Sequence, residues 1–531
     1  MVLKKICYLF GLLLLQAFIC VSCQSPSTVE TNEVSTGIGV STTYQEQFRP
    51  QFHFSPESMW MNDPNGMVYY QGEYHLFYQH YPDDNVWGPM HWGHAISTDL
   101  VHWEHLPIAL YPDELGYIFS GSAVVDWQNT SGFGTQENPP LVAIYTYHNP
   151  VGAEENKNDF QYQAIAYSLD KGRNWTKYAQ NPVVPNPGIK DFRDPKVIWH
   201  EASRKWVMVF AAFDHVKLYT SPNLKEWTWV SDFGLDQGSH GGVWECPDLF
   251  PLNSPAGEEK WVLIVSLVDG APNGGSGTQY FIGQFDGETF VNDNSANDVL
   301  WLDYGRDNYA GVTWSDIPED DGRRIFIGWM SNWRYAQQVP TYRWRSAMTL
   351  PRELRLENTP PGIRLVSLPV DEVKVLYGES QLIPDQILSK GQPLGLETSF
   401  DNSLSLIELT VTPDEGAEFI VELGNSLGQK VQVAYDTEQK RYSVDRTVSG
   451  KTDFSEEFSG IHYAPRISKD RTVNLKIYLD HSSLEVFADN GEVVLTELIF
   501  PAPEYDQISL YSHDEATQIQ RGKITELRSI W

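Results

Sequence analysis

From about residue 48 to the C-terminus, hydrophobic positions fall in short runs of Val, Ile, Tyr, Phe and Trp that Gly, Asn, Asp and Pro interrupt. Runs of this length and composition are typical of β-strands, whereas an amphipathic helix repeats its apolar positions roughly every three to four residues. Almost no stretch sustains the helical repeat. The pattern therefore predicts an all-β fold.

A degenerate repeat occupies the first part of this region. Each unit begins with a short motif that leads into a strand, a turn and a second strand. The five unit starts are Asn62-Asp63-Pro64, Ser120-Gly121-Ser122, Arg193-Asp194-Pro195, Glu245-Cys246-Pro247 and Ala310-Gly311-Val312. Repeats with several strands each are typical of propeller blades, whose first strands surround a central axis. We expect a five-bladed β-propeller over residues 48–350, with Asp63, Asp194 and Glu245 meeting at one end of the axis.

After about residue 350 the chain changes to a regular alternation of apolar and polar positions, as in SLSLIELTV and VNLKIYLD. Such alternation places the apolar side chains on one face of each strand, which suits two sheets packed face to face. We expect residues 351–531 to form a linker and a β-sandwich domain. Structural support is the expected role of this domain, with contact to a sugar as the alternative.

The N-terminus has the elements of an export signal. Lys4 and Lys5 precede an apolar run that is too short to span a membrane, and small residues lie before Cys23. We interpret residues 1–22 as a signal peptide of the lipoprotein type, Cys23 as the lipid attachment site and residues 23–47, rich in Ser, Thr, Glu and Gln, as a flexible tether. The expected location is the cell envelope, periplasmic or cell-surface, with membrane contact only through this anchor. Ordinary signal-peptide cleavage is the alternative.

Composition narrows the class of ligand. The chain has 38 basic and 70 acidic residues and a formal net charge of −32, which disfavours nucleic acid and leaves neutral ligands unaffected. An acidic surface that only keeps the protein soluble is the alternative. Cys246 is the single cysteine outside the leader, so no disulfide is expected within the folded part. No Cys and His grouping has metal-site spacing, so neither a metal nor a cofactor is expected.

Three converging carboxylates without metal ligands are suited to breaking a glycosidic bond. An ionised carboxylate attacks or stabilises the reacting sugar carbon, and a protonated one donates its proton to the leaving oxygen. Asp63, between polar Asn62 and Asn65, is expected to stay ionised. The apolar neighbour Trp244 favours the protonated form of Glu245. The residues thus favour Glu245 as the acid, without excluding the reverse assignment.

Three motifs carry a resemblance to a known family. They are Trp60-Met61-Asn62-Asp63-Pro64-Asn65-Gly66, Phe192-Arg193-Asp194-Pro195 and Trp244-Glu245-Cys246-Pro247-Asp248. In this order they resemble the signature motifs of glycoside hydrolase family 32, which contains invertases, inulinases and levanases. The resemblance runs from about residue 50 to the end. It implies a five-bladed β-propeller followed by a β-sandwich, and a retaining enzyme that forms a covalent fructosyl intermediate.

The same resemblance implies a role for each matching residue. Asp63 is the expected nucleophile, Glu245 the general acid/base and Asp194 the residue that stabilises the transition state. The implied substrate-binding residues are Trp60, Met61, Asn62, Gln79, Trp87, Phe119, Ser120, Arg193 and Trp329. For each aromatic residue in this set, core packing is the alternative, because Trp and Tyr also fill propeller interiors.

The expected activity is release of fructose from the non-reducing end of β-fructans, levan or inulin, and from sucrose. Residues 329–352 resemble exo-acting enzymes, and an endo-acting fructanase is the alternative within the family. A non-catalytic fructan-binding lipoprotein is a second alternative, against which the retained carboxylates argue. A sialidase-like propeller requires an arginine cluster and a Tyr nucleophile, for which no motif is found. The sequence leaves open the choice between β2,1 and β2,6 linkages, the chain-length preference and the oligomeric state.

Overall fold

The computed structural model describes residues 44–531, so the predicted signal peptide, Cys23 and most of the tether lie outside the described residues. Within the described part, strands dominate and the single α-helix is α1 (Pro150–Glu154). This confirms the predicted all-β fold. No helix in residues 44–531 is long and apolar enough to cross a membrane.

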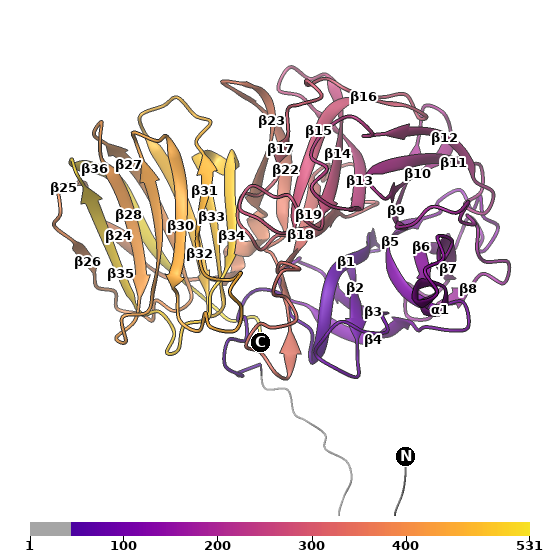
Figure 1. The fold of residues 1–531 in the computed structure, drawn as a ribbon, viewed down its shortest axis with the longest axis horizontal. Coiled ribbons are helices and arrows are strands. Elements are labelled where there is room, and N and C mark those ends of the chain that lie inside the picture. Colours follow the sequence, from indigo (N-terminus) through magenta and orange to yellow (C-terminus); the bar gives the residue numbers. More distant parts are fainter. Residues whose placement is uncertain (1–43) are drawn as a thin grey trace, which may run out of the picture. The chain divides into compact units, whose positions relative to one another are not determined.

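Five sheets form the blades of a propeller (Figure 1). The first contains β1 (Met59–Tyr70), β2 (Glu73–Tyr81), β3 (His91–Ser97), β4 (Glu104–Leu110) and β20 (Trp344–Arg345). The second contains β5 (Tyr117–Val125), β6 (Leu141–His148), β7 (Gln161–Ser168) and β8 (Thr176–Lys177). The third contains β9 (Phe192–His200), β10 (Lys205–Ala212), β11 (His215–Ser221) and β12 (Thr228–Phe233).

The last two blades follow the same order along the chain. The fourth contains β13 (Trp244–Asn253), β14 (Glu259–Leu267), β15 (Gly277–Phe285), β16 (Phe290–Asn292) and β17 (Leu300–Trp301). The fifth contains β18 (Tyr309–Thr313), β19 (Arg324–Met330), β21 (Ala347–Met348), β22 (Arg352–Thr359) and β23 (Gly362–Pro369). Strands β1, β5, β9, β13 and β18 contact one another in a closed ring. These five strands contain the unit starts found in the sequence, which confirms the five-bladed propeller.

A short parallel pairing closes the ring. The chain leaves the fifth blade after β19, and β20 pairs with Met59 and Trp60 at the start of β1. The chain then returns to the fifth blade through β21 and β22, which both pair with β19. The first and last blades are therefore joined by backbone hydrogen bonds in addition to side-chain packing.

The C-terminal strands form two packed sheets, as predicted. One sheet contains β24 (Tyr377–Ile383), β25 (Gln386–Leu388), β27 (Ser405–Pro413), β32 (Val473–Asp480), β33 (Ser483–Ala488), β34 (Val493–Leu498) and β36 (Thr517–Leu527). The other contains β26 (Leu394–Leu396), β28 (Glu418–Gly424), β29 (Lys430–Asp436), β30 (Arg441–Val448), β31 (Ile461–Pro465) and β35 (Gln507–His513). Apolar side chains of the two sheets, such as Ile407, Val421, Val486 and Leu510, share one core. The short 3-10 helices are η1 (Asp371–Leu376) and η2 (Asp489–Gly491).

Strands β22 and β23 bear on the boundary between the domains, which the sequence places at about residue 350. Strands β22 and β23 pair with each other and, through β22, with β19 of the fifth blade. The sequences of these two strands alternate like those of the sandwich, so the alternation did not reveal which sheet they join. We propose that the propeller ends at Pro369 and that η1 begins the connection to the sandwich.

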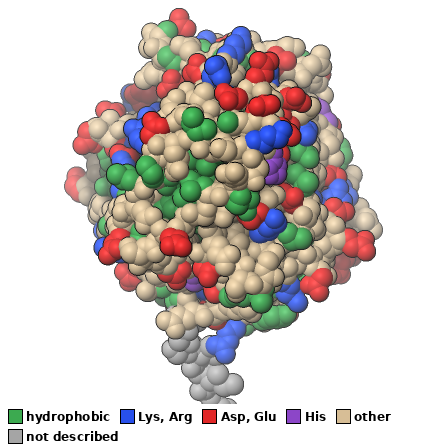
Figure 2. All heavy atoms as spheres, turned by 90° about the vertical axis from the view of Figure 1, so that its left-hand side faces the viewer, with side chains coloured by type: hydrophobic (Ala, Val, Ile, Leu, Met, Phe, Trp, Pro, Cys, Tyr) green, Lys and Arg blue, Asp and Glu red, His purple; other side chains and the backbone are tan. Residues whose placement is uncertain are grey.

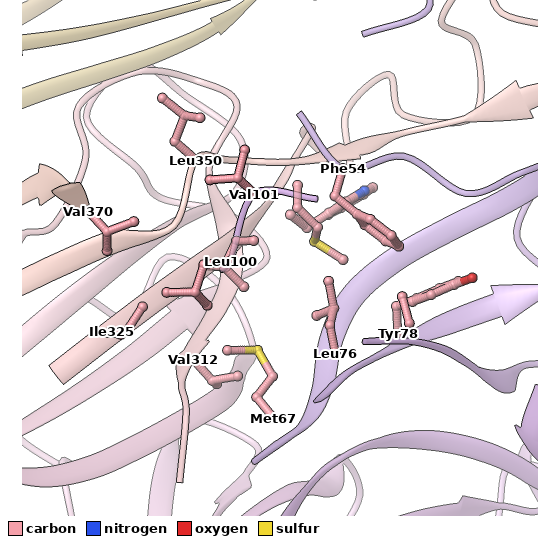
Figure 3. Packing of buried hydrophobic residues seen from close by; sticks show 14 of the residues in the cluster. Phe54, Met67, Leu76, Tyr78, Leu100, Val101, Val312, Ile325, Leu350 and Val370 are labelled. Atoms are coloured by element: carbon pink, nitrogen blue, oxygen red, sulfur yellow. The ribbon is translucent and has the colours of Figure 1, made fainter. Parts of the chain in front are cut away.

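A large hydrophobic cluster lies at the meeting point of the first blade, the fifth blade and the domain connection (Figure 3). Leu76 of β2 and Ile325 of β19 are fully buried there, together with Leu350 and Val370 from the chain segments beside β22 and β23. Burial of such side chains contributes about 1.5–3 kcal/mol each. This cluster holds the first and fifth blades together, and the pairing of β20 with β1 adds backbone hydrogen bonds between the same two blades.

A buried ionic network joins the propeller to the sandwich. Arg352 of β22 donates to Asp303 Oδ2 at 3.0 Å and to Glu485 of β33 at 3.1 Å through Nε. His53 contacts Asp480 Oδ2 and Glu485 Oε1, both at 2.8 Å. Burial opposes protonation of His53, but the two carboxylates outweigh it and raise the pKa of His53 to about 9. Separation of the two domains would expose these buried charges to solvent or leave them without partners, so the ion pairs hold the domains together.

The surface of the sandwich side carries both signs of charge. Figure 2 shows Asp and Glu side chains interspersed with Lys and Arg, and hydrophobic side chains in small groups between them. On this face the negative charge is distributed and does not form one large patch.

Candidate active site

The same irregularity occurs at the start of every inner strand. In each case the inner strand advances by three positions while the neighbouring strand advances by two. These irregularities lie at Met61–Pro64, Ile118–Gly121, Arg193–Lys196, Glu245–Asp248 and Tyr309–Val312. A bulge of this kind bends the strand and redirects side chains. Here the five bulges form one level of the ring, and they contain Asp63, Ser120, Asp194, Glu245 and Tyr309. The predicted convergence of the three carboxylates follows from this shared geometry.

Three of the bulges hold a non-glycine residue in the left-handed region. Asp194 has φ 66° and Cys246 has φ 46°, each before a proline, and Ala310 has φ 53° before Gly311. Such backbone costs on the order of 1–3 kcal/mol and persists where the surrounding structure holds it. Strain of this kind concentrates at functional sites, which agrees with the positions of the carboxylates.

Asp63 accepts hydrogen bonds on both carboxylate oxygens. Ser120 Oγ donates to Oδ2 at 2.6 Å, Asn62 Nδ2 donates to Oδ1 at 2.9 Å, and the Cys246 thiol lies 3.4 Å from Oδ2. The indole Nε1 of Trp60 donates to Asn62 Oδ1 at 2.6 Å and so fixes the orientation of the Asn62 amide. Burial and the charge of Glu245 raise the pKa of Asp63, and these donors act in the opposite direction by stabilising its ionised form.

Glu245 is held by polar groups. Arg193 donates to Oε1 from Nε at 3.0 Å and from Nη2 at 2.6 Å, and the Tyr309 hydroxyl donates to Oε2. Trp244 lies in the hydrophobic cluster between the third and fourth blades, where its Nε1 donates to the Ser239 carbonyl. The apolar contact between Trp244 and Glu245 expected from their adjacency is therefore wrong, because neighbouring residues in a strand point to opposite faces.

Tyr309 is not among the catalytic and substrate-binding residues predicted from the sequence. It is buried, and burial together with the charge of Glu245 raises its pKa, so its hydroxyl stays protonated and can donate. Its signal in the sequence is positional: Tyr309 precedes Ala310-Gly311 just as Glu245 precedes Cys246-Pro247. If the fifth unit is taken to start one residue earlier, Tyr309 occupies the position that corresponds to Glu245 in the fourth unit.

Asp194 lies between the other two carboxyl groups and Arg193. Its Oδ2 accepts from the Cys246 amide at 3.1 Å and lies 3.9 Å from Arg193 Nε. Burial and the charges of Glu245 and Asp63 outweigh the influence of Arg193 and raise the pKa of Asp194 to about 8. The Arg193 guanidinium thus contacts Asp191, Asp194 and Glu245, at 2.6, 3.9 and 2.6 Å. The repulsion of Asp194 by Glu245 and Asp63 favours retention of a proton on Asp194.

A cavity of about 500 Å³ is lined by Glu245, Arg193 and Asp191, whereas Asp63 and Asp194 are not part of its lining. Trp87 and Phe119 lie on its wall with their rings edge to face at 6.0 Å, and Phe119 stacks on His148 at 4.2 Å. Trp87 is 38% exposed, so its ring is available to a ligand. Aromatic walls above converging polar groups are typical of small-molecule sites.

The remaining predicted residues surround the carboxylates from the first blade and the fifth. Trp60 and Trp329 are fully buried and contact each other and Trp333. The Trp329 Nε1–H has no hydrogen-bond partner among the described residues, which leaves a donor for a ligand. Gln79 donates to Asn65 Oδ1 at 2.7 Å, and Met61 is buried in the hydrophobic cluster of Figure 3.

Within residues 44–531, no group of three or more His, Cys, Asp or Glu side chains has an arrangement that could hold a metal ion.

Relatives of known activity span almost the whole described part of the chain. A levanase of Bacillus subtilis is 51% identical over 495 residues, which cover 92% of this chain and 72% of the relative. An extracellular exo-inulinase of Aspergillus awamori is 40% identical over 93% of this chain and 97% of its own length.

Solved structures show the same architecture. The crystal structure of exo-inulinase from Aspergillus awamori matches with a TM-score of 0.85 and 38% identity, over 92% of this chain and all of that one. A β-fructofuranosidase from Schwanniomyces occidentalis complexed with fructosyl-erythritol matches with a TM-score of 0.82 and 32% identity, over 93% and 100% of the two chains. The model of the glycosyl hydrolases family 32 N-terminal domain matches residues 53–369, and that of the family 32 C terminal matches residues 372–526. The chain therefore belongs to glycosyl hydrolase family 32.

Proposed function

We propose that this protein is an exported retaining glycosidase that releases fructose from the non-reducing ends of β-fructans, levan or inulin, and from sucrose. The observation that carries the proposal is the arrangement of three carboxyl groups beside a cavity of about 500 Å³. Asp194 and Glu245 contact Arg193, and the Cys246 thiol lies 3.4 Å from Asp63 Oδ2 and 3.7 Å from Asp194 Oδ2. The levanase and exo-inulinase among the relatives support a fructan as the substrate.

In the proposed first step, ionised Asp63 attacks the anomeric carbon of the terminal fructosyl unit. The bond from that carbon to the leaving oxygen breaks, and Glu245 transfers its proton to this oxygen. Ser120 and Asn62 support the role of Asp63, because their hydrogen bonds favour its ionised form. Arg193 and Tyr309 hold the Glu245 carboxyl in one orientation.

In the second step, Glu245 takes a proton from water as the water oxygen attacks the covalent intermediate. Fructose leaves with its original configuration and Asp63 is regenerated. Asp194 is proposed to hydrogen-bond hydroxyls of the fructosyl ring, in contacts that strengthen as charge develops in the transition state. Trp60, Trp87, Phe119 and Trp329 are proposed to form the walls around the ring.

Product analysis on levan, inulin and sucrose tests the activity. On levan and inulin, fructose alone in the earliest samples is expected for exo action, whereas early oligosaccharides of mixed length would contradict it. Sucrose should yield fructose and glucose in equal amounts. Asp63→Asn, Glu245→Gln and Asp194→Asn test the roles on sucrose and on a fructoside with a good leaving group. The good leaving group should restore the first step only in Glu245→Gln, because that step then needs no proton donor. If added azide rescues Asp63→Asn and never Glu245→Gln, the two roles are reversed.

We also propose that Cys23 carries a lipid after cleavage of the leader. The support is the small residues before this cysteine and the polar stretch after it. Cells that express the full chain with labelled palmitate should yield labelled protein, and Cys23→Ala should abolish the label and release the protein from the membrane fraction. Cys20→Ala is the matched control in the same leader. Unchanged labelling of Cys23→Ala would refute the anchor.

A further inference from the structure

A second cavity lies away from the catalytic carboxylates. It has a volume of about 750 Å³, against about 500 Å³ for the cavity beside Glu245. Its lining includes the later residues of the inner strands, among them Val125 of β5, Trp199 of β9 and Phe250 of β13. Trp199 and Phe250 follow Asp194 and Glu245 by five positions, which corresponds to about 15 Å along a strand. The cavity therefore opens toward the other end of the propeller axis.

Tryptophan side chains dominate the wall of this cavity. Trp127, Trp199, Trp206 and Trp261 all line it, and they come from the second, third and fourth blades. Trp199 and Trp206 meet edge to face at 5.1 Å. Trp206 and Trp261 are buried, so Trp127 and the half-buried Trp199 carry the indole surface that a ligand can reach. The C–H groups of a sugar can pack on such a face while the sugar hydroxyls remain free for hydrogen bonds. The composition of the wall thus suits a carbohydrate.

Trp127 is exposed and yet held in one orientation. The residue is 55% exposed, its Nε1 donates to Asp316 Oδ1 at 2.8 Å, and its ring contacts Tyr70 at 5.8 Å. The other oxygen of Asp316 accepts from the Val125 amide at 2.9 Å, which fixes the carboxylate. An aromatic surface that is already ordered loses little conformational entropy when a ligand binds to it.

Two buried polar atoms at this cavity have no partner among the described residues. They are Ser315 Oγ and Arg324 Nε. A buried polar group without a hydrogen bond costs about 1–3 kcal/mol, and a hydroxyl-rich ligand can supply the missing partner. A purely apolar ligand would leave both atoms unsatisfied. The net charge of −32 disfavours a polyanion, so a neutral ligand with many hydroxyls fits best.

We propose that this cavity is a second carbohydrate-binding site, which binds a segment of the fructan outside the catalytic pocket. The identity of the ligand rests on the proposed function, because a fructan is the neutral polymer on which this enzyme is proposed to act. A polymer that binds at two places on one protein dissociates more slowly than a polymer bound at one. The second site is expected to increase the affinity for long chains relative to sucrose.

Trp127→Ala tests the site, with Trp229→Ala as its matched control. Trp229 is 54% exposed and its Nε1 donates to Asp232 Oδ1 at 2.8 Å, yet it is absent from the cavity lining. In the Asp63→Asn background, migration in gels that contain levan or inulin measures binding without hydrolysis. Trp127→Ala should weaken the affinity about three- to tenfold, and Trp229→Ala should migrate like the parent. Trp127→Phe keeps a ring and should show an intermediate loss.

Kinetics with Asp63 intact give the second measurement. The ratio of KM for the polymer to KM for sucrose should rise in Trp127→Ala and remain at the wild-type value in Trp229→Ala. Equal polymer affinity and equal KM ratios in the two variants would overturn the second site while leaving the fructosidase activity standing. Absence of hydrolysis of every fructan and of sucrose by the wild-type protein would instead refute the proposed function. Thermal unfolding of each variant confirms that the comparison is made on folded protein.

Discussion

Removal of the Ser120 hydroxyl should shift the pH dependence of the reaction. In the structure Ser120 Oγ donates to Asp63 Oδ2 at 2.6 Å, and the hydroxyl stabilises the ionised form of the proposed nucleophile. Burial and the charge of Glu245 already raise the pKa of Asp63. Ser120→Ala removes one of the opposing influences, so the pKa of Asp63 should rise further. Since only ionised Asp63 can attack, kcat/KM should begin to fall at a higher pH than in the wild type.

The size of the shift follows from the kind of hydrogen bond. A bond to a charged group contributes about 1.5–3 kcal/mol when its other partner is retained. One pKa unit corresponds to about 1.4 kcal/mol, so the acid limb of kcat/KM should move upward by about one to two pH units. Asn62 still donates to Oδ1, so the carboxylate keeps its position. At pH values well above the shifted acid limb, kcat/KM of Ser120→Ala should therefore approach the wild-type value.

The assay is the pH profile of kcat/KM on sucrose for the wild type, Ser120→Ala and Ser122→Ala. Ser122 lies on the same strand and both serines are 4% exposed, but Ser122 Oγ accepts from the Val197 amide. Ser122→Ala should lower stability and leave the acid limb where it is. An acid limb that does not move in Ser120→Ala, or that moves equally in both variants, would refute the assignment of this limb to Asp63.

Three further outcomes follow from the buried hydrogen bonds and charges. Tyr309→Phe removes a donor to Glu245 and should lower kcat on sucrose by about 10- to 100-fold with a smaller effect on KM; an unchanged kcat would contradict the positioning role. The pKa of His53 is raised to about 9, so its contribution to stability is complete below about pH 6.5 and is lost as the pH rises through 9. Urea unfolding between pH 6 and pH 10 should show this loss in the wild type and a flatter profile in His53→Gln. Arg352→Met removes the cation that pairs with Asp303 and Glu485, and although Glu485 keeps His53 as a partner, the buried charge of Asp303 loses its cation. The change should cost about 3–5 kcal/mol of unfolding free energy, measured in the same assay; a loss below about 1 kcal/mol would contradict the role of Arg352 in joining the domains.

The sequence predicted the propeller because each inner strand begins with a recognisable signal. A proline or glycine directly after Asp63, Ser120 and Asp194, and two residues after Glu245, marks a bulge. A bulge at the same level of each blade brings the side chains together. The count of blades and the meeting of the carboxylates could therefore be read from spacing. Tyr309 was missed because a tyrosine at such a start has the same appearance as a core residue.

Other features depend on pairing between distant segments and leave no local signal. Strand β22 reads RELRLENT, an alternation that would fit the sandwich as well as the fifth blade, and only its pairing with β19 decides between them. The contacts of Arg352 with Asp303 and Glu485 join three separate regions of the chain. The cavity with Trp127 is likewise assembled from four blades, so the sequence shows its tryptophans without showing that they line one cavity.

The parallel pairing of β20 with β1 has a consequence for the order of assembly. Residues 59 and 60 lie near the beginning of the folded part, and their partners Trp344 and Arg345 are made after four blades and part of the fifth. Contacts between such distant segments form late, because the intervening chain must first be ordered. A nascent chain can therefore complete its middle blades before its first one. The strand that carries Asp63 is among the first to be synthesised and among the last to receive its full set of neighbours.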